Sequence, residues 1–468
     1  MNRREFTRGL AIATIASGAR CFAQTAADAV LEVDAESAGM PVAADFTGLS
    51  YESAQLANPQ FFSAGNQPLI QLFRDLSPHG VLRLGGGSSD FTTYSDAPPA
   101  GPPPFEVFGP DTSKTVKAGT ITTSAALENL RAFLDAVNWR CLYGLNLARG
   151  TKQNAIREAA AAQRILGPRL MALQIGNEPD SFRKRYRPAT YAPADFMQEW
   201  NEFHSAIAAA VPQAKFAGPD ISNKLAYFQA FAAQAAQYPD VILLTAHAYA
   251  MGPAQSPNAT LDKLLSDDPS VQTQPEKSLD AILAAAKTAH LPYRMCEGNS
   301  CWDGGEPGVS DTLASALWCG DFMLHLAQKE VAGVNMHGGN GYYTPIAGAP
   351  STGFTRRPEY FGMQLAQHFA GCTLLRSTLR TSNPKLTAYA ARCGRALRLA
   401  VFNKSTDAAA VALPALFTGR LRHAEKIVLT GPAFDSKEAA LSPASPMPAR
   451  LRRLEIPAHS AILYKVEI

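Results

Sequence analysis

The sequence predicts an α/β protein, a (β/α)8 TIM barrel with a C-terminal β-sandwich domain that also takes an N-terminal strand. Two observations predict the barrel. Eight short apolar, β-rich runs recur between positions 45 and 338, and longer amphipathic stretches with helical spacing separate them. A third observation predicts the sandwich: from about Cys372 onward, short alternating strands divided by turn residues replace the helical stretches.

The barrel strands are short runs that end in Gly, Asn, Asp or other polar residues. They are expected at 45–52, 80–86, 139–147, 170–178, 214–220, 240–249, 291–299 and 330–338. Between them, stretches such as "SAALENLRAFLDAVN" and "ADFMQEWNEFHSAIAAAV" are typical of amphipathic helices. An open doubly wound sheet is the main alternative. It would need a phosphate-binding loop after the first strand, and this sequence has none there.

The chain is expected to divide into four segments. These are a signal segment at 1–27, a strand at 28–40 that joins the sandwich, a catalytic barrel at 41–370 and a β-sandwich domain at 371–468. A Pro-rich segment at 95–111 follows the second barrel strand and is too short to be a domain. Its position predicts a loop on the active face of the barrel.

The N-terminus has the pattern of an export signal. Asn2-Arg3-Arg4-Glu5-Phe6 is a twin-arginine motif, and the apolar stretch after it is too short to span a bilayer. The pattern predicts cleavage near Ala23 or Ala27 and a mature protein in the periplasm or the medium, with no membrane segment. The alternative is a disordered tail with an accidental arginine pair.

Composition excludes several classes of function. A net charge of +3 over 468 residues gives no basic field for nucleic acid. Six cysteines remain once Cys21 is removed with the signal, and none has zinc-site spacing. The histidines include no close metalloprotease pair. We therefore expect no metal, no cofactor and mostly free thiols, although one bridge, Cys372 to Cys393, can form after export.

Polar residues follow the apolar runs where the active site of a barrel lies, at the carboxyl ends of the strands. Acidic, amide and aromatic side chains dominate, which is typical of sugar binding rather than of phosphate or metal binding. They include Glu52, Asp90, Asn177, Glu178, His247, Tyr249, Glu297, Tyr342 and Tyr343. A histidine such as His247 is more often a hydrogen-bonded residue at the rim of the core than a ligand.

Glu178 and Glu297 each come directly after an apolar run, on the fourth and seventh predicted strands. A retaining glycosidase needs two carboxyl groups about 5 Å apart, one as acid/base and one as nucleophile. Strands four and seven can present such a pair across the mouth of a barrel. The alternative is that both are solvated loop carboxylates.

The motifs around these glutamates resemble glycoside hydrolase family 79, the family of heparanase and bacterial β-glucuronidases. "QIGNEPD" and "RMCEGNS" resemble its acid/base and nucleophile segments. "FTGLSYESAQLANPQF", "LRLGGGSSDF", "AHAY" and "GVSDTLASALW" resemble it in the same order. The resemblance covers nearly the whole barrel and implies a retaining enzyme without a cofactor that acts on a glucuronide or an acidic polysaccharide.

The resemblance also implies roles for the two glutamates and their neighbours. Glu178 matches the general acid/base, and Glu297 matches the nucleophile. Asn177 matches the amide that binds the sugar 2-hydroxyl, and Tyr249 matches the phenol that orients the nucleophile. Glu52 and Asp90 fit polar contacts to the sugar.

For the sugar carboxylate, the resemblance implies backbone amides at Gly304 and Gly305 together with Tyr343. Trp302 departs from the family pattern, because a smaller or phenolic residue is expected at that position. The carboxylate pocket is therefore expected to differ in shape.

The run "RKRYR" places Arg183, Lys184, Arg185 and Arg187 just after Glu178. A polyanionic substrate would contact such a cluster, so Arg183 and Arg185 are candidate substrate-binding residues, and we lean to internal cleavage of heparan-like chains. The alternatives are an exo-acting β-glucuronidase, a glycosidase for a neutral sugar, a non-catalytic carbohydrate-binding protein, and, for the cluster itself, a merely solvated face.

Overall fold

The structure, a computed structural model, describes residues 27–96, 104–107, 115–266, 276–339, 341–418, 423–448 and 451–467. The twin-arginine motif and the apolar stretch after it lie outside the described residues. So do positions 97–103 and 108–111 of the Pro-rich segment. The export prediction therefore stays a prediction.

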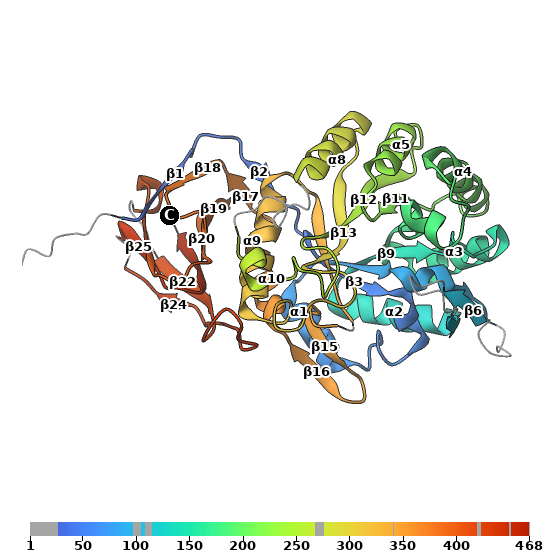
Figure 1. Cartoon of the computed structure of the whole chain (residues 1–468), viewed down its shortest axis with the longest axis horizontal. Helices are drawn as coiled ribbons and strands as arrows, with labels where there is room; N and C mark the ends of the chain where they lie inside the picture. The colour runs from blue at the N-terminus through green and yellow to red at the C-terminus, as the bar shows by residue number, and fades with distance from the viewer. Residues whose placement is uncertain are drawn as a thin grey trace, which may run out of the picture.

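Eight parallel strands close into a barrel (Figure 1). In chain order they are β3 (Thr47–Glu52), β4 (Val81–Gly85), β9 (Arg140–Leu145), β10 (Leu170–Ile175), β11 (Phe216–Ile221), β12 (Val241–Tyr249), β13 (Tyr293–Asn299) and β14 (Gly333–His337). β14 pairs with β3, which closes the ring. Each strand coincides with one of the eight predicted runs, and β11 alone extends past its run, by one residue to Ile221, so the predicted barrel is confirmed. The runs are almost continuously apolar because a parallel strand in a barrel is buried on both faces.

Helices surround the barrel and pack apolar side chains against it. They are α1 (Gln67–Leu76), α2 (Ser124–Val137), α3 (Lys152–Leu166), α4 (Pro193–Ala210), α5 (Leu225–Ala235), α8 (Glu276–Ala289), α9 (Leu313–Gln328) and α10 (Pro358–Gln367). The side chains of Thr123 and Thr151 accept hydrogen bonds from the first turns of α2 and α3, which fixes where these helices begin. No helix in the described part of the chain is long and apolar enough to cross a membrane.

Two sheets form the sandwich beside the barrel (Figure 1). The smaller sheet has the order β18 (Ser377–Thr381), β1 (Ala29–Val33), β21 (Ala409–Ala412) and β25 (Arg453–Ile456). The larger sheet contains β2 (Met40–Pro41), β17 (Thr373–Leu375), β19 (Leu386–Cys393), β20 (Ala396–Asn403), β26 (Ser460–Glu467), β22 (His423–Thr430), β23 (Ala440–Leu441) and β24 (Ser445–Pro446).

The N-terminal strand β1 lies inside the smaller sheet, antiparallel to β18 and parallel to β21, as predicted. Its inward side chains Ala29 and Leu31 are buried with Val401 and Val411 in a core between the two sheets. Burial of alternate side chains explains why a strand more than 340 residues away in sequence completes this sheet.

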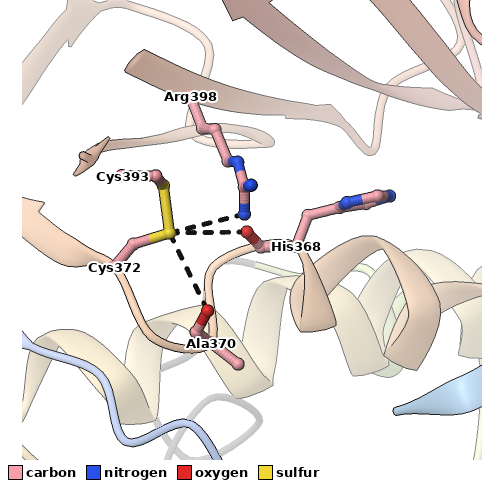
Figure 2. Close-up of a disulfide and its surroundings, with 5 residues drawn as sticks. All are labelled: His368, Ala370, Cys372, Cys393 and Arg398. Carbon is pink, nitrogen blue, oxygen red and sulfur yellow. Dashed lines mark hydrogen bonds between the residues drawn. A yellow bond between two sulfur atoms is a disulfide. The ribbon is translucent and has the colours of Figure 1, made fainter. Parts of the chain in front are cut away.

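Cys372 and Cys393 form a disulfide, the one bridge that the sequence allowed (Figure 2). It links the residue before β17 to the last residue of β19, where Thr373 and Arg392 are already paired across the two strands. Arg398 Nη1 lies 3.4 Å from the Cys372 sulfur. The other described cysteines, Cys141, Cys296, Cys301 and Cys319, are free and buried.

The excursion after β4 contains more regular structure than the predicted loop. A 3-10 helix η2 (Gly87–Phe91) is followed by β5 (Thr92–Tyr94), which pairs with β8 (Thr120–Thr122). Between them β6 (Pro104–Val107) pairs with β7 (Thr115–Ala118) as an antiparallel hairpin. The proline count suggested a loop. However, Pro104 is the first residue of its strand, where a missing N–H breaks no interior ladder bond.

Candidate active site

The two predicted catalytic glutamates lie at the carboxyl ends of β10 and β13. Glu297 is inside β13, and Glu178 follows β10 by three residues. The chain leaves β10 through Gly176 at a φ of 93° and Glu178 at a φ of 46°. Pro179 then begins the 3-10 helix η4 (Pro179–Lys184), and the Glu178 N–H donates to the Asp220 carbonyl at 2.8 Å. This turn directs the Glu178 side chain into the barrel mouth.

The carboxyl groups of Glu178 and Glu297 lie close together around His247 of β12. One oxygen from each glutamate and a ring nitrogen of His247 all lie within 4.8 Å of one another. His247 Nδ1 is 3.0 Å from Glu178 Oε1 and 3.7 Å from Glu297 Oε1. The structure thus brings together two carboxyl groups that are 119 residues apart in sequence (297 − 178).

Glu297 is held as an ion. The Tyr249 hydroxyl donates to its Oε1 at 2.8 Å, and Arg83 Nη1 donates to its Oε2 at 2.5 Å. Burial alone would raise the pKa of Glu297. The charges of His247, His337 and Arg83 outweigh burial, and together with the Tyr249 hydrogen bond they lower that pKa to about 2.

Glu178 lies in a different environment. Its side chain is 27% exposed, three times the 9% of Glu297, and it contacts His247. The more buried glutamate therefore has the denser set of positive partners, and the more exposed one is partly accessible to solvent. Such a difference between two neighbouring carboxyl groups can separate a nucleophile from a proton donor.

Arg83 lies at the centre of the site, a role that the sequence analysis did not give it. Its guanidinium is fully buried and also donates to Asp220 Oδ2 at 2.5 Å and to Asn177 Oδ1 at 2.8 Å. Further donors reach Ser50 at 3.2 Å and Gln174 at 3.3 Å. A lone arginine inside the apolar run "VLRLGG" was the available signal, because a buried charge needs partners.

Asp220 is the second residue that the sequence analysis passed over. It is buried at the end of β11 and adopts a φ of 61°, an uncommon conformation for a residue with a side chain. Like Glu178, Asp220 is the last residue of a predicted strand, "AKFAGPD", and this position could have identified it as a candidate site residue. Unlike Glu178 and Glu297, Asp220 lay outside the motifs that resemble the family.

A cleft of about 540 Å³ opens beside Glu297 at the ends of β3, β4, β13 and β14. Its lining consists of Glu52, Ala54, Gln55, Ser88, Gly304, His337, Gly338, Gly339, Gly341 and Tyr343. Glu52 is fixed there by the Ser88 N–H, which donates to its Oε2 at 2.7 Å. Two of the predicted sugar contacts, Glu52 and Tyr343, therefore share one cavity with Gly304.

The turn at Gly304 and Gly305 requires glycine, because φ is 85° and 83°. A Cβ on Gly305 would lie 2.9 Å from Cδ1 of Tyr343. Tyr343 is buried with its ring 6.4 Å from that of Tyr249 and 5.7 Å from that of His337. The turn and the phenol are packed as one unit, next to the nucleophile.

Trp302 and Tyr342 lie at the edge of this unit. Their side chains are 36% and 45% exposed, and the Trp302 ring packs edge-on against Tyr249 at 6.3 Å. The Tyr342 N–H donates to the Gly304 carbonyl, which ties the two loops together. Both aromatic side chains are exposed, whereas Tyr343 reaches the cleft from a largely buried position.

Asp90 is buried in η2 close to both Glu178 and Glu52. Burial raises the pKa of Asp90 well above its usual range, and the two nearby glutamates add to this shift. Tyr186 and Arg185 oppose it. A raised pKa favours the protonated form of Asp90, which can donate a hydrogen bond as well as accept one.

The structure separates the four cations of "RKRYR". Arg183, Lys184 and Arg185 are exposed, and Arg185 lies near Asp90. Arg187 instead donates to Glu199 of α4 at 2.8 and 3.2 Å and to three backbone carbonyls. Only three of the four predicted cations therefore face solvent. Spacing alone cannot distinguish a free arginine from one paired across helices.

Two groups of side chains at the site contain donor atoms of the kind that hold metals. They are Asp220 with His247 and Cys296, and Glu178 with His247 and Glu297. In both groups the carboxylates already have a cationic partner, because Arg83 contacts Asp220 and Glu297. The donor atoms thus serve an internal ion-pair network, and a metal would have to displace Arg83.

A comparison with known proteins found two sequence relatives of this chain. No family model matches the chain. A β-glucuronidase of Aspergillus niger is 25% identical over 411 residues, covering 79% of this chain and 73% of that protein. A β-glucuronidase of Neurospora crassa is 26% identical over 324 residues, covering 62% and 56%.

Solved structures show the same architecture. A 4-O-α-L-rhamnosyl-β-D-glucuronidase from Fusarium oxysporum has a TM-score of 0.72 at 18% identity, covering 94% of this chain and 100% of that chain. A family 51 arabinofuranosidase from Xanthomonas axonopodis pv. citri has a TM-score of 0.69 at 14% identity, with the same coverage. At these identities, the structural likeness establishes the fold.

Proposed function

We propose that this protein is a retaining β-glucuronidase that hydrolyses β-linked glucuronic acid. The carrying observation is the pair of carboxyl groups, Glu178 and Glu297, with oxygens within 4.8 Å of each other. That separation matches the roughly 5 Å of retaining glycosidases and is shorter than the roughly 6.5–9.5 Å of inverting ones. The two sequence relatives named β-glucuronidase support the choice of sugar.

In the proposed reaction, Glu297 attacks the anomeric carbon while Glu178 gives its proton to the departing oxygen. The C–O bond to the leaving group breaks, and the glycosyl group becomes an ester of Glu297. Water then attacks the same carbon, Glu178 takes the proton of that water, and the ester bond breaks. A pKa of about 2 keeps Glu297 ionised and ready to attack at neutral pH.

The sugar carboxylate is proposed to lie against the turn at Gly304 and Gly305. Backbone N–H groups in a left-handed turn form a concavity that favours anions. The Tyr343 hydroxyl is the neighbouring side-chain donor. Trp302 at the edge of the same turn carries an indole, which can only donate, where the resembling family has a smaller or phenolic residue.

For the natural substrate, we lean to internal cleavage of heparan sulfate-type chains, in line with the resemblance to family 79. The exposed cations after Glu178 support this. Arg183 and Lys184 are the last residues of η4, the 3-10 helix that begins just after Glu178, and Arg185 follows it. An exo-acting enzyme for small glucuronides is the alternative. Sizing the products from heparan sulfate and from an aryl β-glucuronide distinguishes them: internal cleavage lowers polymer size before any monosaccharide accumulates.

Chemical rescue tests the roles of the two glutamates. Glu297→Gln should abolish turnover of every glucuronide. Glu178→Ala should retain activity on aryl glucuronides with good leaving groups, and azide should increase it with formation of a β-configured glucuronyl azide. Glu202→Gln, a change at an exposed carboxylate far along α4, is the control and should match the wild type.

Three outcomes contradict parts of this proposal. An α-configured azide product from Glu178→Ala would reverse the two roles. An aryl glucoside cleaved better than the glucuronide would favour a neutral-sugar glycosidase. A wild-type protein that binds glucuronides without cleaving them would be a carbohydrate-binding protein.

A further inference from the structure

Asp220 is buried and contacts the two cations of the site, Arg83 and His247. Its Oδ2 accepts from Arg83, which in turn holds Glu297. Its Oδ1 lies 3.2 Å from His247 Nε2, and the other ring nitrogen of His247 lies 3.0 Å from Glu178. Its backbone carbonyl accepts the N–H of Glu178. A single buried residue thus connects to both glutamates, each through one cation.

The surroundings of His247 favour an imidazolium. Its side chain is almost fully buried, and a carboxylate oxygen lies near each ring nitrogen: Glu178 Oε1 is 3.0 Å from Nδ1, and Asp220 Oδ1 is 3.2 Å from Nε2. The titratable or charged groups that face it are Glu178, Asp220, Tyr293, Cys296 and Glu297, with Arg83 one contact further away. Burial acts against the proton, but Glu297 and Asp220 raise the pKa of His247 well above its usual range.

We propose that Asp220 is a positioning residue that holds His247 as an imidazolium between Glu178 and Glu297, where its positive charge stabilises whichever glutamate is negative. The inference rests on the proposed function, because it concerns how that reaction proceeds. The five-residue charge network is defined as Arg83, Glu178, Asp220, His247 and Glu297.

The charges of this network balance before and after the bond to the leaving group breaks. Before the step, Arg83 and His247 are positive, Asp220 and Glu297 are negative and Glu178 is protonated, so the network is neutral. During the step Glu297 loses its charge to the ester bond, and Glu178 gains one by giving up its proton. The network remains neutral, and the negative charge has moved from one neighbour of His247 to the other.

The positive charge of His247 lies beside both glutamates and stays in place while the negative charge passes from Glu297 to Glu178. It therefore lowers the activation barrier without any rearrangement of the site. Without the Asp220 carboxylate, two cations would share the site with one anion. His247 would then lose its proton at a lower pH, and the charge that serves Glu178 after proton transfer would be missing. We expect removal of the Asp220 carboxylate to slow the chemical step rather than to weaken substrate binding, because Asp220 is buried beneath the cleft.

Asp220→Asn tests this, because it removes the charge and keeps the shape. On 4-nitrophenyl β-glucuronide, kcat should fall about 100-fold, with KM within about twofold. The alkaline limb of kcat against pH should move down by about one unit, since loss of one neighbouring anion lowers the pKa of His247. Asp321→Asn is the matched control: it removes a buried carboxylate that is bound to Lys404, far from the cleft. It should lower the melting temperature and leave kcat and the pH limb unchanged.

Nitrogen NMR of the wild-type protein gives a second test that needs neither a variant of Asp220 nor a substrate. The His247 ring, assigned with His247→Gln, should carry protons on both nitrogens at pH 7.5. A neutral ring overturns the inference, as does an Asp220→Asn protein that differs from wild type only in melting temperature. If the wild type does not cleave glucuronides at all, the proposed function fails instead, and the NMR result still decides the state of His247.

Discussion

Glu178 and Glu297 differ because the chain presents them differently. Glu297 is inside β13, so Tyr249 of the neighbouring strand β12 and Arg83 of the more distant strand β4 reach its two oxygens. Glu178 follows its strand in a left-handed turn, which leaves its side chain partly exposed. Because solvation and charge set a carboxyl pKa, the same side chain can be a nucleophile at one position and a proton donor at the other.

The environment of Tyr343 leads to a prediction about substrate choice. Burial, with the charges of Glu297 and Glu52, raises the pKa of Tyr343, so its hydroxyl keeps its proton and can donate to a carboxylate. Tyr343→Phe should remove one hydrogen bond to a charged group, about 1.5–3 kcal/mol, or about 10- to 150-fold in kcat/KM on glucuronides. Residual glucoside activity should be spared.

The measurement compares kcat/KM on paired aryl glucuronide and aryl glucoside substrates. Tyr238→Phe, which removes a hydroxyl bonded to Asn201 on the outside of the barrel, is the control and should change neither. Equal losses on both substrates for Tyr343→Phe would reject the role in binding the carboxylate.

The segment from η4 to Arg187 combines exposed and structural cations. Arg183 and Lys184 lie near Lys224 at the start of α5, since burial lowers the pKa of Lys224 and these two charges lower it further. Arg185 lies on the other side, near Asp90. Arg187 fastens the segment to α4 through Glu199. One short element thus presents cations toward two neighbouring parts of the barrel mouth.

Changing Arg183, Lys184 and Arg185 together to Gln should weaken hydrolysis of heparan sulfate and flatten its salt dependence. Exposed charges are individually weak and screened, but several acting on a polymer add up. Turnover of a small aryl glucuronide should barely change. The result is read from initial rates on both substrates at several salt concentrations, and an equal response of both substrates would make the three cations a solvated face.

Arg187→Gln is the contrasting variant. It should lower the free energy of unfolding by about 1–3 kcal/mol, because it breaks hydrogen bonds to a charged partner. It should not change the salt dependence. If Arg187→Gln instead weakens hydrolysis of heparan sulfate and the triple variant does not, the ion pair between Arg187 and Glu199 opens when substrate binds.

The sandwich and the barrel are joined by a buried ion pair. Lys404, just after β20, lies 2.7 Å from Asp321 of α9, and both side chains are almost fully buried. Thr387 and Tyr389 of β19 also donate to Asp321, each at 2.7 Å. Despite burial, the Lys404 charge and these hydroxyls hold the pKa of Asp321 below its usual value. The contribution to stability is therefore present above the unfolded pKa and is lost as the pH falls through the lower folded one.

Lys404→Met should leave a buried carboxylate without its cation and cost about 3–5 kcal/mol of unfolding free energy. The loss should be greatest at neutral pH and should shrink in acid, where Asp321 becomes protonated. Denaturant unfolding of the whole chain at several pH values measures this. Lys152→Met, which breaks an exposed pair with Glu202, should cost less than about 1 kcal/mol. A similar small loss for Lys404→Met would show that the pair does not stabilise the junction.

Local patterns in the sequence were sufficient for the architecture and for two of its key side chains. Alternating apolar runs and helical stretches determine the barrel, because burial on both faces of a parallel strand leaves a continuous apolar run. Glu178 and Glu297 were predictable for the same reason: a carboxylate directly after such a run has to lie at a strand end. The run at 29–37 was assigned to the sandwich from its position before the first barrel strand, and the observed strand is Ala29–Val33.

Only the tertiary structure decided which charges meet. Arg83, Asp220 and His247 come from β4, β11 and β12, and no spacing along the chain relates them. Arg187 looked like its neighbours in "RKRYR", yet it pairs with a helix 12 residues away. The periodicity of apolar residues along the sequence indicates which residues are buried. The partner of a buried charge depends instead on closure of the barrel. That closure brings side chains from distant strands within hydrogen-bonding distance and fixes their protonation.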